Sequence, residues 1–424
     1  MHYKMKPHIN FLFPLLLLYI HFGHLATLKA NKGCHIDSFK TRAPLLIYHE
    51  TATLIYPEYN NKTNFFAGEI LDITCPGARI LSGGEQLTSL TTITCIDKEK
   101  FLVNGKTTKW SQIMCSNDVN PDIQEIKYNE LSEDDPNINC NDANLKIIKI
   151  GFKLTTDRFV DLIDVCFDSK IKLARYSFAK VIPNVEYRAR NVSRPGFRQD
   201  DLFYRMGRSL RMIYRNNQAT INAIVNLVDN STKYVNGRTF LNRGHLAPRA
   251  DFFFEAQQRA TFRYINVAPQ WSTFNGGNWN IMEADVRNYV SKNNVLLHTW
   301  TGIYGISTLQ NEYTENFEKL YLYIDDNDRR NSPALPVPAV FWKLLYDPVN
   351  QKGIVLVGHN NPYEEINNQG QKICDRDVSG SVSWLNWDKH NVARGYSYAC
   401  RTDDNKFLNL IFEIPKFIGV DLLN

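Results

Sequence analysis

The chain has 424 residues, of which 43% are hydrophobic and 22% charged, and its formal net charge is +5. This length allows two or three domains with ample core, and the absence of internal repeats and low-complexity tracts excludes repeat architectures. The charge is unevenly distributed, because residues 31–150 carry 12 basic and 16 acidic side chains whereas residues 151–424 carry 34 and 28. A basic surface attracts polyanions, but this excess is too small to indicate a nucleic-acid partner by itself.

The first 30 residues predict a secretory signal peptide. Lys4 and Lys6 precede an apolar run at residues 9–20, and small residues follow around Ala26 and Ala30, near one of which we expect cleavage. A membrane anchor is the alternative, but the run is short for a spanning helix, and no later stretch is long and uncharged enough to cross a bilayer. We therefore expect a secreted, extracellular protein, for which saliva or the gut lumen would be suitable compartments.

Cysteine usage agrees with secretion. Beyond the predicted signal peptide the chain has Cys34, Cys75, Cys95, Cys115, Cys140, Cys166, Cys374 and Cys400. An even number behind a signal peptide predicts an oxidising compartment and up to four disulfides, whose pairing the sequence leaves open. Zinc binding is the competing interpretation, but no Cys-x-x-Cys spacing occurs. Glycosylation sequons lie at Asn61, Asn191 and Asn230.

Residues 31–129 predict a small, disulfide-stapled β domain. Short β-type runs at residues 45–48, 70–74 and 91–94 alternate with glycine-rich turns, and four of the eight cysteines lie in this segment. Its function is not indicated by any motif in the segment.

The remainder of the chain predicts a linker and a second domain. Residues 130–144 are acidic, polar and poor in large apolar side chains, which is typical of an exposed connection. The second domain is predicted over residues 145–424 and begins with strand-like runs at residues 147–150 and 160–163. The apolar run at residues 407–423 predicts a buried strand and a tail.

Residues 201–216 contain a regular series of arginines. Arg205, Arg208, Arg211 and Arg215 recur at spacings of three, three and four, which on a helix would align four guanidinium groups along one face. A solvated helix face is the plainer interpretation. Because four cations with no acidic residue among them repel one another, a bound polyanion would stabilise the face, and a nucleic-acid contact is the second interpretation.

Two motifs in the middle of the chain are more informative. Residues 242–252 are Asn-Arg-Gly-His-Leu-Ala-Pro-Arg-Ala-Asp-Phe, residues 266–279 are Asn-Val-Ala-Pro-Gln-Trp-Ser-Thr-Phe-Asn-Gly-Gly-Asn-Trp, and Glu283 follows. β-type residues at 234–235 and 238–241 lead into the first motif, and residues 265–267 suggest a second short strand. A helical apolar spacing then involves Trp279, Met282, Val286, Tyr289 and Val290. The sequence predicts a strand–loop–strand–helix unit with His245 on the strand side and Asn275 at the helix start.

These residue types are the ones that phosphodiester hydrolysis needs. A neutral imidazole at His245 can take a proton from water, and Arg243 beside it can hold a phosphate through a bidentate contact. The carboxamide oxygen of Asn275 suits Mg²⁺, which keeps most of its waters, and Glu283 could hold one of those waters. A lone histidine near a glycine, or a lone Asn-Gly-Gly, is more often structural. Two such motifs in this order favour the catalytic interpretation.

The two motifs resemble those of the DNA/RNA non-specific endonuclease family, the ββα-metal group that includes the Serratia-type secreted nuclease and mitochondrial endonuclease G, and most of all its secreted arthropod branch. The resemblance covers about residues 150–415 and is specific over residues 242–283. It implies an α+β fold class, in which a ββα-metal nuclease domain with mixed or antiparallel sheets and flanking helices here follows the small disulfide-rich β domain. It also implies cleavage of single- or double-stranded DNA and RNA to 5′-phosphate products.

The resemblance further implies roles for individual residues. His245 would be the general base, Arg243 would stabilise the transition state, and Asn275 would be the sole direct protein ligand of Mg²⁺, for which Mn²⁺ could substitute. Glu283 would orient metal-bound water, and Asn266 would support the site. The predicted nucleic-acid contacts are Arg194, Arg198, Arg205, Arg208, Arg211, Arg215 and Arg249.

One position departs from the family pattern. Many relatives have aspartate immediately before Arg-Gly-His, where this chain has Asn242. Asparagine keeps the hydrogen-bonding shape but removes a negative charge, so we expect an altered rate or metal affinity rather than loss of activity. A further arginine that some relatives use corresponds to either Arg194 or Arg198, between which the sequence does not choose.

The leading hypothesis is therefore a secreted, Mg²⁺-dependent, sugar-non-specific endonuclease. The alternative is a secreted, salivary-type nucleic-acid-binding protein on the nuclease scaffold with weak cleavage, which Asn242 and the arginine series motivate. A third hypothesis is an adhesion protein that acts through its front domain, but that segment lacks interleaved aromatic and basic residues and metal clusters. DNA and RNA, contacted through the backbone without sequence specificity, are the predicted partners, and no membrane partner is predicted.

Overall fold

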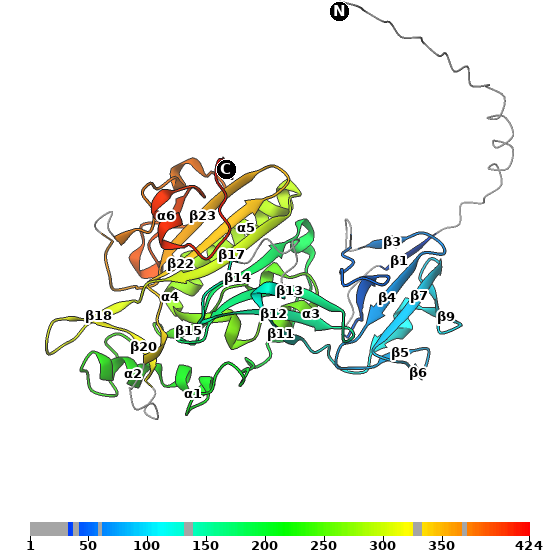
Figure 1. Cartoon of the computed structure of the whole chain (residues 1–424), viewed down its shortest axis with the longest axis horizontal. Coiled ribbons are helices and arrows are strands. Elements are labelled where there is room, and N and C mark those ends of the chain that lie inside the picture. Colours follow the sequence, from blue (N-terminus) through cyan, green and yellow to red (C-terminus); the bar gives the residue numbers. More distant parts are fainter. Residues whose placement is uncertain (1–32, 37–41, 58–61, 131–138, 325–332, 367–370) are drawn as a thin grey trace, which may run out of the picture.

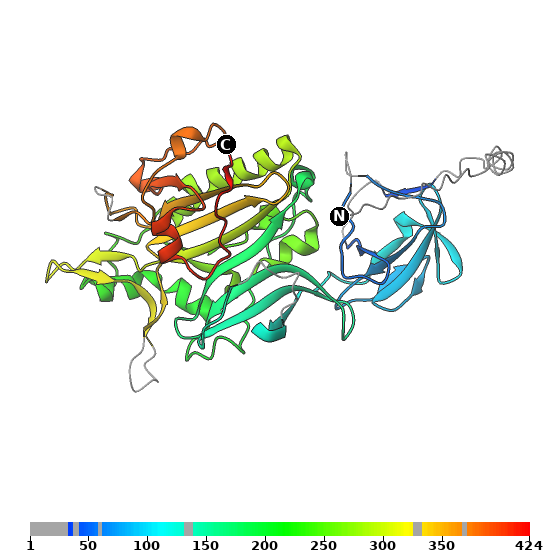
Figure 2. The same cartoon turned by 45° about the horizontal axis from the view of Figure 1, so that its top comes forward.

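The computed structural model describes residues 33–36, 42–57, 62–130, 139–324, 333–366 and 371–424 (Figure 1). The predicted signal peptide, the sequon at Asn61 and most of the predicted acidic linker lie outside these ranges. Among the described residues, no helix is both long and apolar enough to span a bilayer. The chain forms a front domain of short strands and a larger unit built on one long sheet (Figures 1 and 2).

The front domain is the predicted set of short β-strands. Its strands are β1 (Cys34–Ile36), β2 (Leu45–Tyr48), β3 (Thr63–Phe65), β4 (Ile70–Thr74), β5 (Ile80–Ser82), β6 (Glu85–Gln86), β7 (Leu90–Asp97), β8 (Lys100–Val103), β9 (Lys106–Lys109) and β10 (Ile113–Cys115). The order β2-β4-β7-β8-β9 makes a five-stranded antiparallel sheet, β10-β5-β6 makes a second sheet, and β1 pairs with β3. The disulfides Cys34–Cys95 and Cys75–Cys115 cross-link this domain.

The larger unit is organised by a nine-stranded sheet. Its order is β11-β12-β13-β14-β17-β22-β23-β24, with β25 beside β23. The strands are β11 (Asp122–Ile126), β12 (Leu145–Lys153), β13 (Phe159–Asp168), β14 (Leu173–Val181), β17 (Leu297–Tyr304), β22 (Val340–Asp347), β23 (Lys352–His359), β24 (Ser397–Cys400) and β25 (Asp421–Leu422). Every neighbouring pair is antiparallel except β23 and β25. The α+β class predicted from the sequence is confirmed.

The position of β11 corrects the predicted domain boundary. This strand precedes residue 130, where we expected the linker to begin, but it pairs with β12 and extends the large sheet. The predicted front domain of residues 31–129 therefore includes a strand that belongs to the larger unit. Sequence reasoning misplaced the boundary because the acidic composition of residues 130–144 marks an insertion between two paired strands and not a break between domains.

Both faces of the large sheet are covered, which explains its nearly continuous apolar strands. Phe341 and Leu345 of β22 face the core that contains Met282 and Val286. Val340, Trp342 and Leu344 face a second hydrophobic cluster on the other side of the sheet. This alternation follows from the two-residue repeat of a strand. Helix α5 (Asn280–Asn293) covers the first face, and α6 (Asn405–Leu410) covers the second (Figures 1 and 2).

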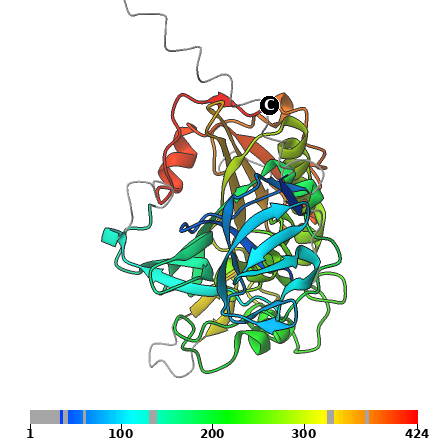
Figure 3. The same cartoon turned by 90° about the vertical axis from the view of Figure 1, so that its right-hand side faces the viewer.

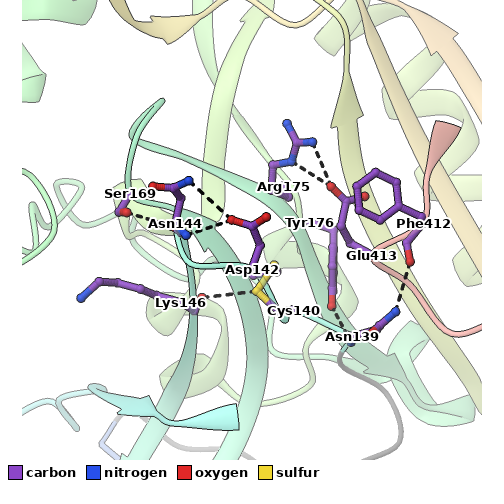
Figure 4. The surroundings of a disulfide bond; sticks show 11 residues. Asn139, Cys140, Asp142, Asn144, Lys146, Ser169, Arg175, Tyr176, Phe412 and Glu413 are labelled. Atoms are coloured by element: carbon purple, nitrogen blue, oxygen red, sulfur yellow. Dashed lines mark hydrogen bonds and ion pairs between the residues drawn. A yellow bond between two sulfur atoms is a disulfide. The ribbon is translucent and has the colours of Figure 1, made fainter.

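The second face is closed by the C-terminal segment and two disulfides. Cys140 bonds to Cys166 on β13, and Cys374 bonds to Cys400 on β24, so all eight cysteines are paired. Beside the first of these, Asn139 donates from its amide to the carbonyl of Phe412 at 3.1 Å (Figure 4). The buried strand predicted at residues 407–423 is wrong, because this run begins inside α6 and reaches only the short β25. Asp404 caps α6 by accepting a hydrogen bond from the Phe407 amide.

The strand–loop–strand–helix unit is present. Strand β15 (Leu241–His245) pairs antiparallel with β16 (Val267–Trp271), and His245 faces Val267 in the register. Chain reversal through α4 (Ser272–Phe274) and a π turn (Asn275–Trp279) leads directly into α5. Residues 234–240, where we expected β structure, are bends without strand pairing, so β15 begins only at Leu241.

The predicted arginine helix is shorter than expected. Helix α1 (Leu210–Arg215) contains Arg211 and Arg215, whereas Arg205 and Arg208 precede it in irregular backbone. Ser209 caps α1 by accepting from the Met212 amide, which fixes the helix start after Arg208. The remaining short elements are α2 (Asn217–Ile224), α3 (Glu255–Ala260), β18 (Thr308–Gln310), β19 (Phe317–Lys319), β20 (Tyr321–Ile324) and β21 (Pro333–Pro336).

The front domain packs directly on the larger unit. Figure 3 views the molecule from the end at which the front domain lies, so that its strands are in front. The Tyr56 ring stacks on Phe254 with 5.5 Å between ring centroids, and its hydroxyl accepts a hydrogen bond from Gln257 at 2.7 Å. Arg158 of the larger unit pairs with the buried carboxylate of Asp72 at 3.0 Å. The two units are therefore joined by apolar packing and by a partly buried ion pair.

Candidate active site

A cleft of about 1010 Å³ opens over the ends of β15 and β16 and the start of α5. It is lined by seven of the residues singled out in the sequence, namely Arg194, Arg215, Arg243, His245, Arg249, Asn275 and Glu283. Five others, Arg198, Arg205, Arg208, Arg211 and Asn266, do not line it. The chain thus brings the two motifs to one cavity, together with only part of the arginine series.

His245 lies in the wall of this cleft between two aromatic rings. Its ring centroid is 5.3 Å from that of Phe197 and 5.1 Å from that of Phe262. Burial, together with the positive charges of Arg194 and Arg249, lowers the pKa of His245 to about 3. The buried Nε2 atom has no hydrogen-bond partner among the described residues. The imidazole is therefore neutral near pH 7 and has a free ring nitrogen.

Asn266 fixes the backbone next to His245 through hydrogen bonds. Its carboxamide oxygen accepts from the Ala247 amide at 3.0 Å, and its nitrogen donates to the Ala247 carbonyl at 2.9 Å. The same oxygen accepts from the Ser177 hydroxyl on β14. Asn266 is fully buried and is satisfied by these bonds, so it supports the first motif without facing the cleft.

Arg243 is held by aromatic rings. The guanidinium carbon lies 5.2 Å from the Phe197 ring centroid, 5.7 Å from that of Tyr214 and 5.9 Å from that of Tyr264. These distances fit cation–π attraction. No hydrogen bond or ion pair links the Arg243 side chain to another described residue, so its N–H donors are available to a phosphate in the cleft.

Asn275 and Glu283 also line the cleft and carry oxygen atoms in their side chains. Asn275 begins the π turn, and its side chain makes no hydrogen bond to any described residue. Burial raises the pKa of Glu283 to about 7, and the nearby Arg287 acts in the opposite direction. A free carboxamide oxygen beside a carboxylate is a donor set that fits a hydrated Mg²⁺ or Mn²⁺ ion, because such ions take oxygen ligands and keep several waters.

The π turn is held in place by hydrogen bonds to residues 388–395, which we call the C-terminal latch. Asn278 donates to the carbonyls of Asp388 and Gly395, each at 2.7 Å, and accepts from the Asp388 amide at 3.1 Å. Gly277 is non-helical within the turn, and a β-carbon on it would lie 2.8 Å from the Arg394 carbonyl oxygen. The position of Asn275 thus depends on a segment more than 100 residues away.

The electrostatics of the cleft are strongly positive. Six arginines line it, Arg188, Arg194, Arg215, Arg243, Arg249 and Arg287, against the single carboxylate of Glu283. Arg287 pairs with the buried Asp251 at 2.9 Å, and Lys343 lies 3.7 Å from the same carboxylate. The Asp251 carboxylate therefore lies close to two buried cations. The cleft as a whole attracts anions.

The structure distinguishes the positions of the two upstream arginines. Arg194 lines the cleft near His245 and Arg249, where its charge acts on both groups. Arg198 instead donates to the carbonyl of Pro121, at the junction with the front domain. The sequence could not separate them, because they lie four residues apart in one polar segment.

Two residues of the cleft were missed by the sequence analysis. Gln270 faces Asn242 in the β15–β16 register, and its fully buried carboxamide has no partner among the described residues. A β-carbon at Gly244 would lie 2.2 Å from its Oε1 atom, which explains the glycine. Gln270 could have been found, because it belongs to the second motif. Phe197, which contacts both His245 and Arg243, gave no such signal.

Comparisons with known proteins agree with this geometry. The family model described as DNA/RNA non-specific endonuclease matches residues 143–405. A salivary endonuclease of Lutzomyia longipalpis is 27% identical over 354 residues, which cover 83% of this chain and 75% of that protein. A salivary endonuclease of Culex quinquefasciatus is 27% identical over 66% of this chain and 70% of its own length. A solved structure of an EndoG/EndoGI complex has 20% sequence identity and a TM-score of 0.33, and covers 47% of this chain and 71% of that one.

The α+β fold, the cationic cleft and these relatives define a nuclease. Because the family model matches more than half of the chain, the protein belongs to the DNA/RNA non-specific endonuclease family, whose members are in general metal-dependent.

Proposed function

We propose that the protein is a secreted, Mg²⁺-dependent endonuclease that hydrolyses phosphodiester bonds of both DNA and RNA, single- or double-stranded, to 5′-phosphate products. Mn²⁺ would substitute for Mg²⁺. Its salivary relatives and its four disulfides support secretion. The exposed sequons at Asn191 and Asn230 would carry glycans in that setting.

The residues of the cleft divide the chemical work. His245 accepts a proton from the attacking water, and Asn266 fixes the backbone that carries His245. Arg243 binds the scissile phosphate through donors that no described protein group occupies, and Arg194 and Arg249 add positive charge beside it. Asn275 and Glu283 would hold the ion with its waters. A bound Mg²⁺ supplies stabilisation of the negative charge that develops on the phosphoryl group and the leaving oxygen.

One observation carries this proposal. A neutral imidazole with an unpartnered buried Nε2 atom lies in the wall of a cleft that six arginines line. Asn275 and Glu283 line the same cleft, so a neutral imidazole, cations for the phosphate and oxygen ligands for a metal ion meet in one cavity.

Digestion with and without metal tests the proposal. Purified protein is incubated with plasmid DNA, single-stranded DNA, single-stranded RNA and double-stranded RNA, in Mg²⁺ and then in EDTA. We expect all four to be cut with Mg²⁺ and none with EDTA. The variant His245→Ala should reduce the rate by roughly 10²–10⁴-fold while nucleic-acid binding is retained, because this is the usual contribution of a positioned general base.

The matched control is His298→Ala. His298 is also a partly buried histidine with a pKa lowered by burial to about 4, but it packs against Phe178 and Trp300 outside the cleft. This variant should keep most of the activity. Full persistence of all four substrates at high enzyme concentration, with tight and salt-sensitive binding, would instead establish the nucleic-acid-binding alternative that Asn242 and the many arginines suggest.

A further inference from the structure

A second cavity of about 790 Å³ lies where the front domain meets the larger unit. We call it the junction pocket. The front domain contributes residues 42–45 and the neighbourhood of Asp118, and the larger unit contributes residues 186–193 and part of α3. Figure 1 shows α3 on the side of the larger unit that faces the front domain. The pocket therefore exists only because the two units are packed together.

The junction pocket and the cleft share a wall. Arg188 lines both cavities, and the segment at residues 186–194 runs from one to the other. This segment is fixed by hydrogen bonds, since the Ala189 amide donates to the Phe253 carbonyl and Gln258 donates to the Ala189 carbonyl, each at 2.9 Å. The two cavities are therefore adjacent along this segment.

Four arginines and three carboxylates line the junction pocket, the carboxylates being Asp118, Glu186 and Glu255. Asp118 pairs with Arg259 at 2.9 Å and lies 3.9 Å from Arg42, a long contact between half-exposed groups that contributes little. Within the described part of the chain, Arg188 and Arg190 form no ion pair, and each donates only to a nearby backbone carbonyl. Burial lowers the pKa of Arg188 to about 10, and the charge of Arg190 adds to this effect. Such crowding of like charges is relieved when an anion binds.

An aromatic side chain accompanies these cations. Tyr187 lines the junction pocket beside Arg188 and is 39% exposed. Aromatic rings interleaved with basic residues along a groove are how proteins hold single-stranded nucleic acids, since bases stack on the rings while the cations follow the phosphates. Here one ring, that of Tyr187, precedes three cations, Arg188, Arg190 and Arg194, within eight residues.

We propose that the junction pocket is a second nucleic-acid subsite, which binds the phosphates and a base of the same single strand that occupies the catalytic cleft. The front domain then has a role in the reaction. It supplies one wall of this subsite, including Arg42, and lets the enzyme hold long substrates more tightly than short ones. This inference rests on the proposed nuclease function for the chemistry in the cleft, but binding at the junction pocket can be measured without cleavage.

The test measures binding in EDTA, with His245→Ala in every protein so that no strand is cut. Fluorescence anisotropy compares labelled single strands of about 6 and about 30 nucleotides, since one binding groove accommodates on the order of 4–16 nucleotides. We expect the double variant Arg42→Gln/Arg190→Gln to weaken binding of the long strand about tenfold and to reduce the dependence of its affinity on salt by about one to two phosphate contacts. The short strand should lose much less, because it can be held by the cleft alone.

The matched control is Lys100→Gln/Arg376→Gln, which removes one exposed positive charge from each unit away from both cavities. It should bind both strands like the parent protein. A second probe is Tyr187→Leu, which should weaken binding of the long single strand more than that of a duplex of equal length. All proteins are measured with and without enzymatic removal of N-linked sugars, because the sequon at Asn191 lines the pocket.

Equal affinity of the double variant and its control for the long strand would overturn the inference. Heparin is tested as a second polyanion. If the double variant binds heparin more weakly but binds the single strand normally, the pocket binds a different polyanion and the inference is overturned as well. The outcome is separable from that of the proposed function. If the parent protein cuts no substrate but the double variant binds the long strand more weakly, the subsite is supported and the nuclease function is refuted. If the parent protein cuts and the double variant binds the long strand normally, the nuclease function is supported and the subsite is refuted.

Discussion

At the scale of single residues, the site depends on surroundings that change the behaviour of ordinary side chains. His245 is kept neutral by burial and by neighbouring arginines, so the imidazole is unprotonated over a wide pH range. Arg243 is positioned by aromatic faces, which attract the cation without using its N–H donors. The two motifs alone predict neither the burial of His245 nor the aromatic surroundings of Arg243, because Phe197 and Tyr214 lie outside both motifs.

The aromatic surroundings of Arg243 can be tested at Tyr214. We expect Tyr214→Leu to lower kcat/KM about tenfold, because removing one ring weakens the attraction that holds Arg243 by roughly 1 kcal/mol or more. Tyr214→Phe is the matched control. It keeps the ring and removes a buried hydroxyl that has no hydrogen-bond partner among the described residues, so it should cut at the parental rate. Steady-state kinetics on a defined oligonucleotide decide the matter, and equal losses in the two variants would rule out a role for the ring.

At the scale of elements, the π turn between β16 and α5 is the part of the candidate site that is held by residues far away in the sequence. It presents Asn275 to the cleft, and it is held by bonds from Asn278 to the segment at residues 388–395. A π turn inside a helical segment is often found at functional sites. We infer that the C-terminal latch determines where the carboxamide of Asn275 points.

Two adjacent glycines test this inference. Gly277→Ala would place a β-carbon 2.8 Å from the Arg394 carbonyl oxygen and should displace the turn from its latch. We expect the metal concentration for half-maximal activity to rise about 10- to 100-fold, as is typical when supporting contacts of a metal ligand are lost. Gly276→Ala is the control, since a β-carbon there meets no atom within 4 Å. Similar metal titrations for the two variants would show that the latch does not control Asn275.

The elements also show where sequence patterns are sufficient and where they are not. Runs with clear two-residue alternation or β-branched residues, such as β2 and β4, were predicted with correct bounds. The arginine series was overextended into a single helix because a spacing of three and four residues satisfies a helical pattern whether or not the backbone is helical. The cap at Ser209 decides that α1 starts only at Leu210.

At the scale of the whole molecule, buried histidines link stability to pH. The pKa of His245 is lowered by burial to about 3, and those of His298 and His359 to about 4. In the unfolded chain these groups titrate near pH 6.5, so below that value the unfolded state binds more protons. Their contribution to stability is complete above about pH 6.5 and is lost as the pH falls towards 4. Glu283, with its pKa raised to about 7, acts in the opposite direction but is a single group.

We therefore expect the free energy of unfolding of the metal-free protein to fall between pH 6.5 and pH 4.5, on the order of 2 kcal/mol per pH unit near pH 5. Guanidinium unfolding at several pH values measures this slope. In the variant His298→Phe the slope should be smaller, because one of the three histidines that bind a proton on unfolding is removed. A slope that is unchanged by this substitution, or stability that rises on acidification, would contradict the account.

The sequence by itself determined the family of this protein and the residue types of its candidate site. The two motifs predicted a histidine, an arginine, a carboxamide and a carboxylate on a strand–loop–strand–helix unit, and the cysteine count predicted the disulfides, because local spacing and residue type carry this information. Only the tertiary structure decided which cysteines pair, that Arg194 rather than Arg198 lines the cleft, and that β11 belongs to the large sheet. Those outcomes depend on contacts between residues that are far apart in the chain, such as Asn278 with Gly395 and Arg198 with Pro121, and no local pattern specifies such contacts.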